Sequence, residues 1–180
     1  MCKKSLCALF IGGLLAGGMS SAFATDTGTV TFNGKIIDDT CDVTVNSTDA
    51  NGTVTFKDVY PSAFTADDSV GDSQTFDIAL TGCDTNIDKI NLKFNGTTVT
   101  SKTSVLKTTG VATNVGVRLV NWAGADVLFD NSEPASTSDK TVKGTGAATF
   151  TYTAKVVQVG SVKPTAGDYT AQATYTLLYR

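Results

Sequence analysis

The sequence predicts an all-β fold built from short antiparallel strands. Threonine is the commonest residue, and valine, isoleucine, tyrosine and phenylalanine recur in short runs in which apolar and polar residues alternate. Glycine, asparagine and aspartate cluster between these runs, and no window keeps a helical period. Such a composition favours strands joined by turns. Turn signals at roughly every 12 residues further favour a β-sandwich of immunoglobulin type.

The first residues have the features of an export signal. They combine two lysines with an apolar run broken by glycines over residues 6–18, and Ala-Phe-Ala follows at residues 22–24. A signal peptidase cleaves after small residues in such a setting. A membrane anchor is the alternative, but the apolar run is shorter than the roughly 20 residues that a span needs. We therefore predict that residues 1–24 are a secretory signal peptide, removed after Ala24.

The remainder of the chain has the size of one acidic domain. Removing 24 of the 180 residues leaves 156, which is enough to bury a core without a metal. The removed segment holds two of the 14 Lys+Arg and none of the 17 Asp+Glu, so the net charge changes from −3 to −5. An acidic surface without basic clusters argues against nucleic acid or an anionic membrane as partner. Because the chain has no histidine and a single glutamate, we predict no enzyme activity, catalytic residue, metal site or cofactor.

Two cysteines, Cys41 and Cys83, remain after removal of the signal. In an exported chain they are expected to form one disulfide. The alternative is a thiolate nucleophile or a metal ligand. Without histidine there is no imidazole to activate a thiol or to complete the usual zinc site.

The alternating runs define the expected strands along the chain. We expect turns at Asn95-Gly96 and at Ala123-Gly124, where the residue types are those of tight hairpin turns. A short helical turn is expected within residues 60–66. The expected strands cover residues 41–45, 52–59, 75–80, 89–94, a weaker run around Val105, and residues 114–122, 126–129, 149–157 and 169–180.

Both ends of the expected mature chain carry alternating apolar residues. At the C-terminus the alternation runs to the last residue, with tyrosine, alanine and leucine on one face and threonine on most of the other. At the N-terminus the run TVTFNGKII precedes Cys41, and therefore lies outside the expected disulfide loop. This run could be the first strand of its own sandwich, as in most secreted β domains. Its inward positions are Val30, Phe32, Gly34 and Ile36.

A resemblance to a known family favours a different interpretation of the N-terminal run. The chain has an alternating N-terminal arm, a cysteine soon after it, a second cysteine in GCDTN at residues 82–86, and a C-terminal strand with a penultimate tyrosine. Together these features resemble the type 1 fimbrial subunits assembled by the chaperone–usher route. The segment ATNVGV at residues 112–117 also resembles the major pilin of that family. The resemblance covers nearly all of residues 28–180.

The resemblance implies an incomplete immunoglobulin-like β-sandwich, the pilin fold, that lacks its final strand. In that family the gap is a hydrophobic groove, which the N-terminal arm of the next subunit fills by donor-strand exchange. The implied division is a donor arm at residues 25–38 and a sandwich at residues 39–180. Val30, Phe32 and Ile36 match the apolar donor positions, and Gly34 matches the glycine that meets a tight part of the groove.

The resemblance also implies partners and a location. The partners are identical or homologous pilin subunits, a periplasmic chaperone and an outer-membrane usher, and the product is a fimbria on the cell surface that supports adhesion. The implied chaperone-binding residues are Tyr175, Leu177, Tyr179 and Arg180. Arg180 departs from the neutral polar residue that usually ends the family, and a cation beside the terminal carboxylate predicts a weaker grip by basic chaperone residues.

Three functions follow from these observations. The first is a structural subunit of the fimbrial shaft. The second is a minor adaptor or terminator subunit of the same fimbria. The third is a secreted monomeric β-sandwich that binds a ligand, which requires the N-terminal arm to pair within its own chain.

Overall fold

The structure is a computed structural model that describes residues 29–33 and 41–180. The expected signal peptide at residues 1–24 lies outside the described residues, as do Gly34 and Ile36 of the expected donor arm. Residues 29–33 form no strand. No helix in the described part of the chain is long and apolar enough to cross a membrane. The body, residues 41–180, is described below by itself.

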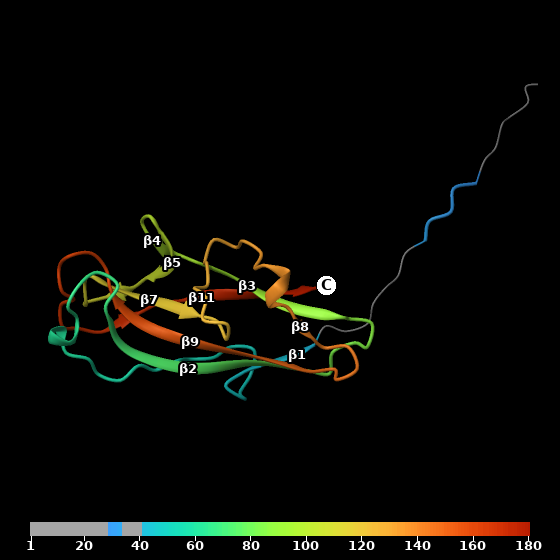
Figure 1. Cartoon of the computed structure of the whole chain (residues 1–180), viewed down its shortest axis with the longest axis horizontal. Coiled ribbons are helices and arrows are strands. Elements are labelled where there is room, and N and C mark those ends of the chain that lie inside the picture. The colour runs from blue at the N-terminus through green and yellow to red at the C-terminus, as the bar shows by residue number, and fades with distance from the viewer. Residues whose placement is uncertain (1–28, 34–40) are drawn as a thin grey trace, which may run out of the picture. The chain divides into compact units, whose positions relative to one another are not determined.

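The larger sheet of the body is antiparallel throughout (Figure 1). The two longest strands, β2 and β9, pair with each other over most of their length. Both lie in the interior of the sheet, so each has a neighbouring strand on either side. In spatial order its strands are β1 (Asp42–Val45), β2 (Val70–Thr81), β9 (Ala148–Gln158), β7 (Val115–Val120), β5 (Lys102–Lys107) and β4 (Thr98–Val99).

The smaller sheet places the C-terminal strand at one edge. Its order is β11 (Ala173–Tyr179), β3 (Lys89–Gly96) and β8 (Lys140–Thr141). Figure 1 shows β3 and β11 on the opposite side of the body from β2 and β9. The remaining elements are the two-stranded pair β6 (Thr109–Gly110) and β10 (Tyr169–Thr170), and the short 3-10 turns η1 (Pro61–Ala63) and η2 (Ser136–Ser138).

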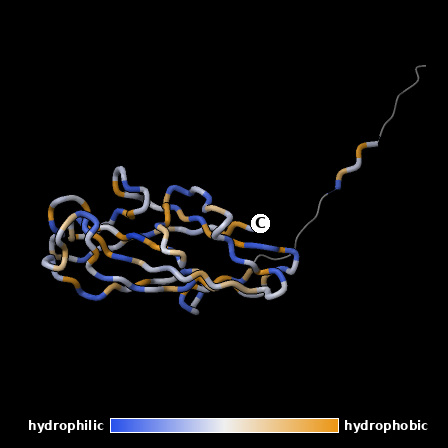
Figure 2. Tube along the Cα trace, viewed as in Figure 1, coloured by the Kyte–Doolittle hydropathy of each residue, from blue (hydrophilic) through white to orange (hydrophobic). Residues whose placement is uncertain are grey.

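The core lies between the two sheets and comes from the alternating residues. Successive side chains of a strand point to opposite faces, which appears as alternating hydropathy along the strands in Figure 2. The rings of Phe94 and Tyr152 meet edge to face across the sandwich with centroids 5.2 Å apart, and Trp122 contacts Phe150 at 5.0 Å. The central buried residues are Phe76, Ile78 and Leu80 of β2, Ile90, Leu92 and Phe94 of β3, and Phe150, Tyr152 and Ala154 of β9.

Most expected strands are confirmed, with β2, β3 and β9 longer than expected. The turn at Ala123-Gly124 is also confirmed, because Gly124 has a φ of +83° and the backbone N–H of Asn121 donates to the carbonyl of Ala125 at 2.9 Å. The expected helical turn is confirmed as η1. Residues 126–129, however, form only an isolated bridge through Asp126 and no strand.

The turn expected at Asn95-Gly96 is wrong. Both residues continue β3 and pair with Thr174 and Ala173 of β11. Glycine is needed here for space, since a Cβ on Gly96 would lie 2.5 Å from the side chain of Leu106. Long-range pairing with the last strand therefore overrides the local turn preference.

Residues 52–59, where a strand is expected, have no strand partner among the described residues. The side chains of Val54, Phe56 and Val59 are nevertheless half-buried against the core. The segment is joined to β2 by a hydrogen bond from its backbone to a side chain: the N–H of Lys57 donates to the carboxylate of Asp72 at 2.9 Å. The expected strand at residues 169–180 is interrupted at residues 171–172, which separates β10 from β11.

Candidate functional site: the open edge of the C-terminal strand

Strand β11 is paired along one edge only, as far as the described strands go. At its end, Arg180 and Lys89 exchange both backbone hydrogen bonds, at 2.8 and 2.9 Å. Antiparallel pairing alternates such pairs with pairs whose backbone groups face outward. The outward groups therefore include those of Ala173, Tyr175 and Leu177. We call this row the open edge.

The apolar face of β11 is only half-covered. Ala173, Tyr175 and Leu177 pack against the core but stay partly exposed. Their neighbours on β3 differ sharply, since Ile90, Leu92 and Phe94 are 0%, 3% and 5% exposed. Both strands belong to the same sheet and point apolar residues to the same core, so the difference arises because nothing described covers β11 from its open edge. Similarly half-buried core contacts lie at Val43, Val54 and Phe56.

Residues 50–56 meet β10 and β11 through side chains. The hydroxyl of Tyr175 donates to the carbonyl of Ala50 at 2.6 Å, and the rings of Phe56 and Tyr169 lie 6.3 Å apart. Burial, followed by the nearby Asp49 carboxylate, raises the pKa of Tyr175, so its hydroxyl stays protonated and able to donate. No backbone ladder joins these segments among the described residues. Residues 50–56 therefore contact β10 and β11 through tyrosine side chains, and not through the backbone hydrogen bonds that join adjacent strands.

The predicted disulfide is confirmed. Cys41 and Cys83 are bonded, with Cα atoms 4.1 Å apart, and both residues are buried. The bond ties the residue just before β1 to the connection between β2 and β3. The body therefore begins at a covalently fixed point, immediately after the expected donor arm.

The two apolar donor positions that the structure describes are exposed. The side chains of Val30 and Phe32 are 76% and 90% exposed. Both side chains are therefore available to a partner.

The far end of β11 carries a contact that the sequence did not predict. The guanidinium of Arg180 binds the carboxylates of Asp139 and Glu133, at 2.7 and 3.1 Å. These acids lie 41 and 47 positions away in the chain, and no local pattern marks them as partners. The Arg180 cation that the sequence places beside the terminal carboxylate is thus paired with two acids, and the weaker chaperone grip expected from it stays a prediction.

Comparisons with known proteins agree with this fold. The profile of the family described as "Fimbrial protein" matches residues 30–180. The F17 fimbrial protein of Escherichia coli is 33% identical over 179 residues, covering 95% of this chain and 97% of the relative. The A chain of the type-1 fimbrial protein of Escherichia coli K12 is 30% identical over 168 residues, covering 90% of this chain and 88% of the relative.

Two solved structures resemble this chain as well. The crystal structure of the P pilus rod subunit PapA superposes with a TM-score of 0.66 at 26% sequence identity, covering 78% of this chain and 99% of PapA. The second is a structure of a chaperone–usher pilus that reveals the molecular basis of rod uncoiling. It also has a TM-score of 0.66, at 27% identity, covering 86% of this chain and 96% of that one. The immunoglobulin-like pilin fold, the disulfide and the sequence matches lead to one conclusion: this chain belongs to the fimbrial protein family and is a subunit of a chaperone–usher pilus.

Proposed function

We propose that the chain is a shaft subunit that polymerises head to tail by donor-strand exchange. The observation that carries this proposal is the open edge of β11 beside a half-covered apolar face. In the proposal, residues 25–38 are the arm that one subunit donates, and residues 39–180 are the body that accepts the arm of another. The names of the relatives support the shaft role over an adaptor or terminator role, since PapA is a rod subunit.

The open edge offers backbone groups to one added strand. A strand inserted beside β11 can pair with the outward backbone groups of Ala173, Tyr175 and Leu177, as in other cases of strand addition. Neighbouring strands in a sheet lie about 4.8 Å apart. Two segments on either side of an inserted strand are therefore too far apart for backbone hydrogen bonds, and only long side chains can join them. The contacts from Tyr175 to Ala50 and from Phe56 to Tyr169 are of this kind.

The arm supplies apolar side chains that a partner can bury. Val30, Phe32 and Ile36 alternate with polar residues and would all face the core of the acceptor. Burying three such side chains contributes about 5–9 kcal/mol, while ordering the arm opposes part of this gain. Each subunit gives one arm and accepts one, so the contact does not close on itself and propagates a filament.

The same open edge implies a need for protection before assembly. An unpaired strand edge beside apolar surface promotes aggregation. A periplasmic chaperone that lends a strand to β11 would cover it, contacting Tyr175, Leu177 and Tyr179 and binding the carboxylate of Arg180. An outer-membrane usher would then exchange the chaperone for the arm of the next subunit, and the filament would emerge at the cell surface.

A peptide-binding experiment tests the proposal directly. The body, residues 39–180, is refolded with and without a synthetic peptide of residues 25–38. We expect one peptide to bind per body and to raise the midpoint of thermal unfolding, because the peptide supplies the missing strand. A matched peptide with Val30→Asp and Phe32→Asp should not bind. A body that is equally stable without the peptide would contradict the proposal.

Replacing Gly34 by leucine is expected to slow assembly. If Gly34 meets a tight part of the acceptor, a large side chain there costs about 1–3 kcal/mol, which slows strand exchange by at least about fivefold. Polymerisation of the chaperone-bound subunit, followed by electrophoresis of the unboiled products, measures the rate. Asn33→Leu is the control, since it adds the same side chain to the opposite face of the arm. Equal rates for Gly34→Leu and the unaltered chain would show that this register is wrong.

A further inference from the structure

The last residue of the chain is held by a cluster of groups that we call the C-terminal clamp, formed by Glu133, Pro134 and Asp139. Nη1 of Arg180 donates to the Asp139 carboxylate at 2.7 Å, and Nη2 donates to Glu133 at 3.1 Å and to the carbonyl of Pro134 at 3.3 Å. The Arg180 side chain is 26% exposed and that of Asp139 only 1%. Hydrogen bonds from Asp139, and then from Glu133, raise the pKa of Arg180, so the guanidinium keeps its charge.

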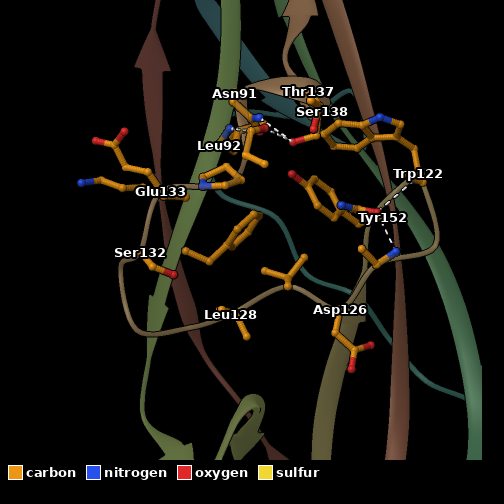
Figure 3. Close-up of a pocket in the computed structure, with 18 residues that line it drawn as sticks. Asn91, Leu92, Trp122, Asp126, Leu128, Ser132, Glu133, Thr137, Ser138 and Tyr152 are labelled. Atoms are coloured by element: carbon orange, nitrogen blue, oxygen red, sulfur yellow. Dashed lines mark hydrogen bonds between the residues drawn. The ribbon is translucent and has the colours of Figure 1, made fainter.

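A second residue, Asn91, helps to orient the carboxylate of Asp139. This carboxylate also accepts a hydrogen bond from Nδ2 of Asn91 at 2.9 Å, and the same amide donates to Ser138 at 3.0 Å. Asn91 is buried, and its side-chain oxygen accepts from the N–H of Leu92 at 2.8 Å. Figure 3 shows Asn91 and Ser138 meeting at the rim of a neighbouring cavity of about 410 Å³, with Glu133 on a nearby part of the same lining. Asn91 and Arg180 bond the same carboxylate oxygen, Oδ1, so Asn91 helps to fix the position of the oxygen that accepts from the guanidinium.

The clamp changes the charge presented at the end of β11. The guanidinium of Arg180 is balanced by two carboxylates. One oxygen of the Arg180 carboxylate accepts from the N–H of Lys89 at 2.8 Å, and none of the ion pairs found among residues 41–180 includes this carboxylate. The terminal carboxylate is therefore bonded to β3 through one oxygen, and it has no cationic partner among the described residues.

We propose that Asp139 and Glu133 are specificity-determining residues for a partner that binds this terminal carboxylate with a cationic side chain. They act by holding the Arg180 guanidinium away from the carboxylate. Released from the clamp, the guanidinium would pair with the carboxylate or repel the incoming cation. This inference rests on the proposed chaperone contact, and it identifies residues that let a chain ending in arginine make that contact.

A double-mutant cycle tests the clamp. The dissociation constant of the chaperone of the same fimbrial system is measured for the unaltered subunit, for Glu133→Gln with Asp139→Asn, for Arg180→Gln, and for the three changes together. We expect the two acid substitutions to weaken binding about fivefold, the size of a 1 kcal/mol charge interaction. In the Arg180→Gln background they should have no effect, because no cation is released.

Two controls separate the clamp from a structural role. Asp88→Asn removes one carboxylate near the same strand end without touching Arg180, and we expect it to leave the dissociation constant unchanged. The amide oxygen introduced by Asp139→Asn can still accept from Asn91, and should this variant fail to fold, Glu133→Gln alone should weaken binding about twofold. Equal weakening with and without Arg180, or no weakening with Arg180 present, would overturn the clamp. Absence of chaperone binding by every variant, including the unaltered chain, would overturn the proposed function itself.

Discussion

Deletion of residues 25–38 is expected to abolish filament formation while leaving a body that still folds. The proposed arm is the only segment that each subunit gives to its neighbour, so its removal eliminates the polymerising contact. It leaves in place the disulfide between Cys41 and Cys83 and every strand of the described body. Filaments sheared from cells that express the deleted chain should lack the subunit, as measured by electrophoresis and electron microscopy, while the chaperone complex is still recovered from the periplasm.

Substitutions within the full-length arm distinguish loss of apolar contacts from loss of length. Val30→Asp with Phe32→Asp should reduce filament yield nearly as strongly as the deletion, because two positions that the proposal buries in the neighbouring subunit become charged. Thr31→Ala with Asn33→Ala changes the opposite face and should leave the yield close to normal. Filaments of normal length and number from the deleted chain would refute donor-strand exchange as the assembly mechanism.

Loss of the disulfide is expected to have the largest effect on stability of any covalent change in the body. Cys41 and Cys83 are 42 positions apart, and closing a loop of this size contributes about 4 kcal/mol to the free energy of unfolding on the chain-entropy account. Replacing both cysteines by alanine should therefore lower the urea midpoint of the peptide-capped body by about 2 M, for a slope of about 2 kcal/mol/M.

Reduction of the unaltered body provides the comparison for this prediction. Reduced protein should unfold at a midpoint close to that of the double alanine variant, since both lack the same cross-link. A loss of less than about 1 kcal/mol in both samples would contradict the prediction, because it would show that the unfolded chain gains little freedom when the bond is absent.

Local patterns in the chain predicted the core well. The alternation of Phe76, Ile78 and Leu80, and of Ile90, Leu92 and Phe94, placed these residues on buried faces, where the structure confirms them. Strand alternation has a period of two residues, so inward positions can be assigned without knowledge of the partner strand.

Local patterns failed where a distant segment decided the outcome. Asn95-Gly96 has the residues of a hairpin turn, yet pairing with β11, almost 80 positions later, keeps it extended. The interruption between β10 and β11 likewise depends on distant neighbours, since β10 pairs with β6 and β11 pairs with β3.

The sequence by itself determined the all-β class, the inward faces, the candidate disulfide and, through resemblance, the fimbrial family, because each depends on short periods or on residue types. Only the tertiary structure decided that β11 keeps an open edge, that Tyr175 spans to Ala50, and that Arg180 is held by Asp139 and Glu133. These features depend on residues dozens of positions apart in the sequence. The packing of complete sheets brings such residues together, and the local alternation of apolar and polar residues does not predict which of them meet.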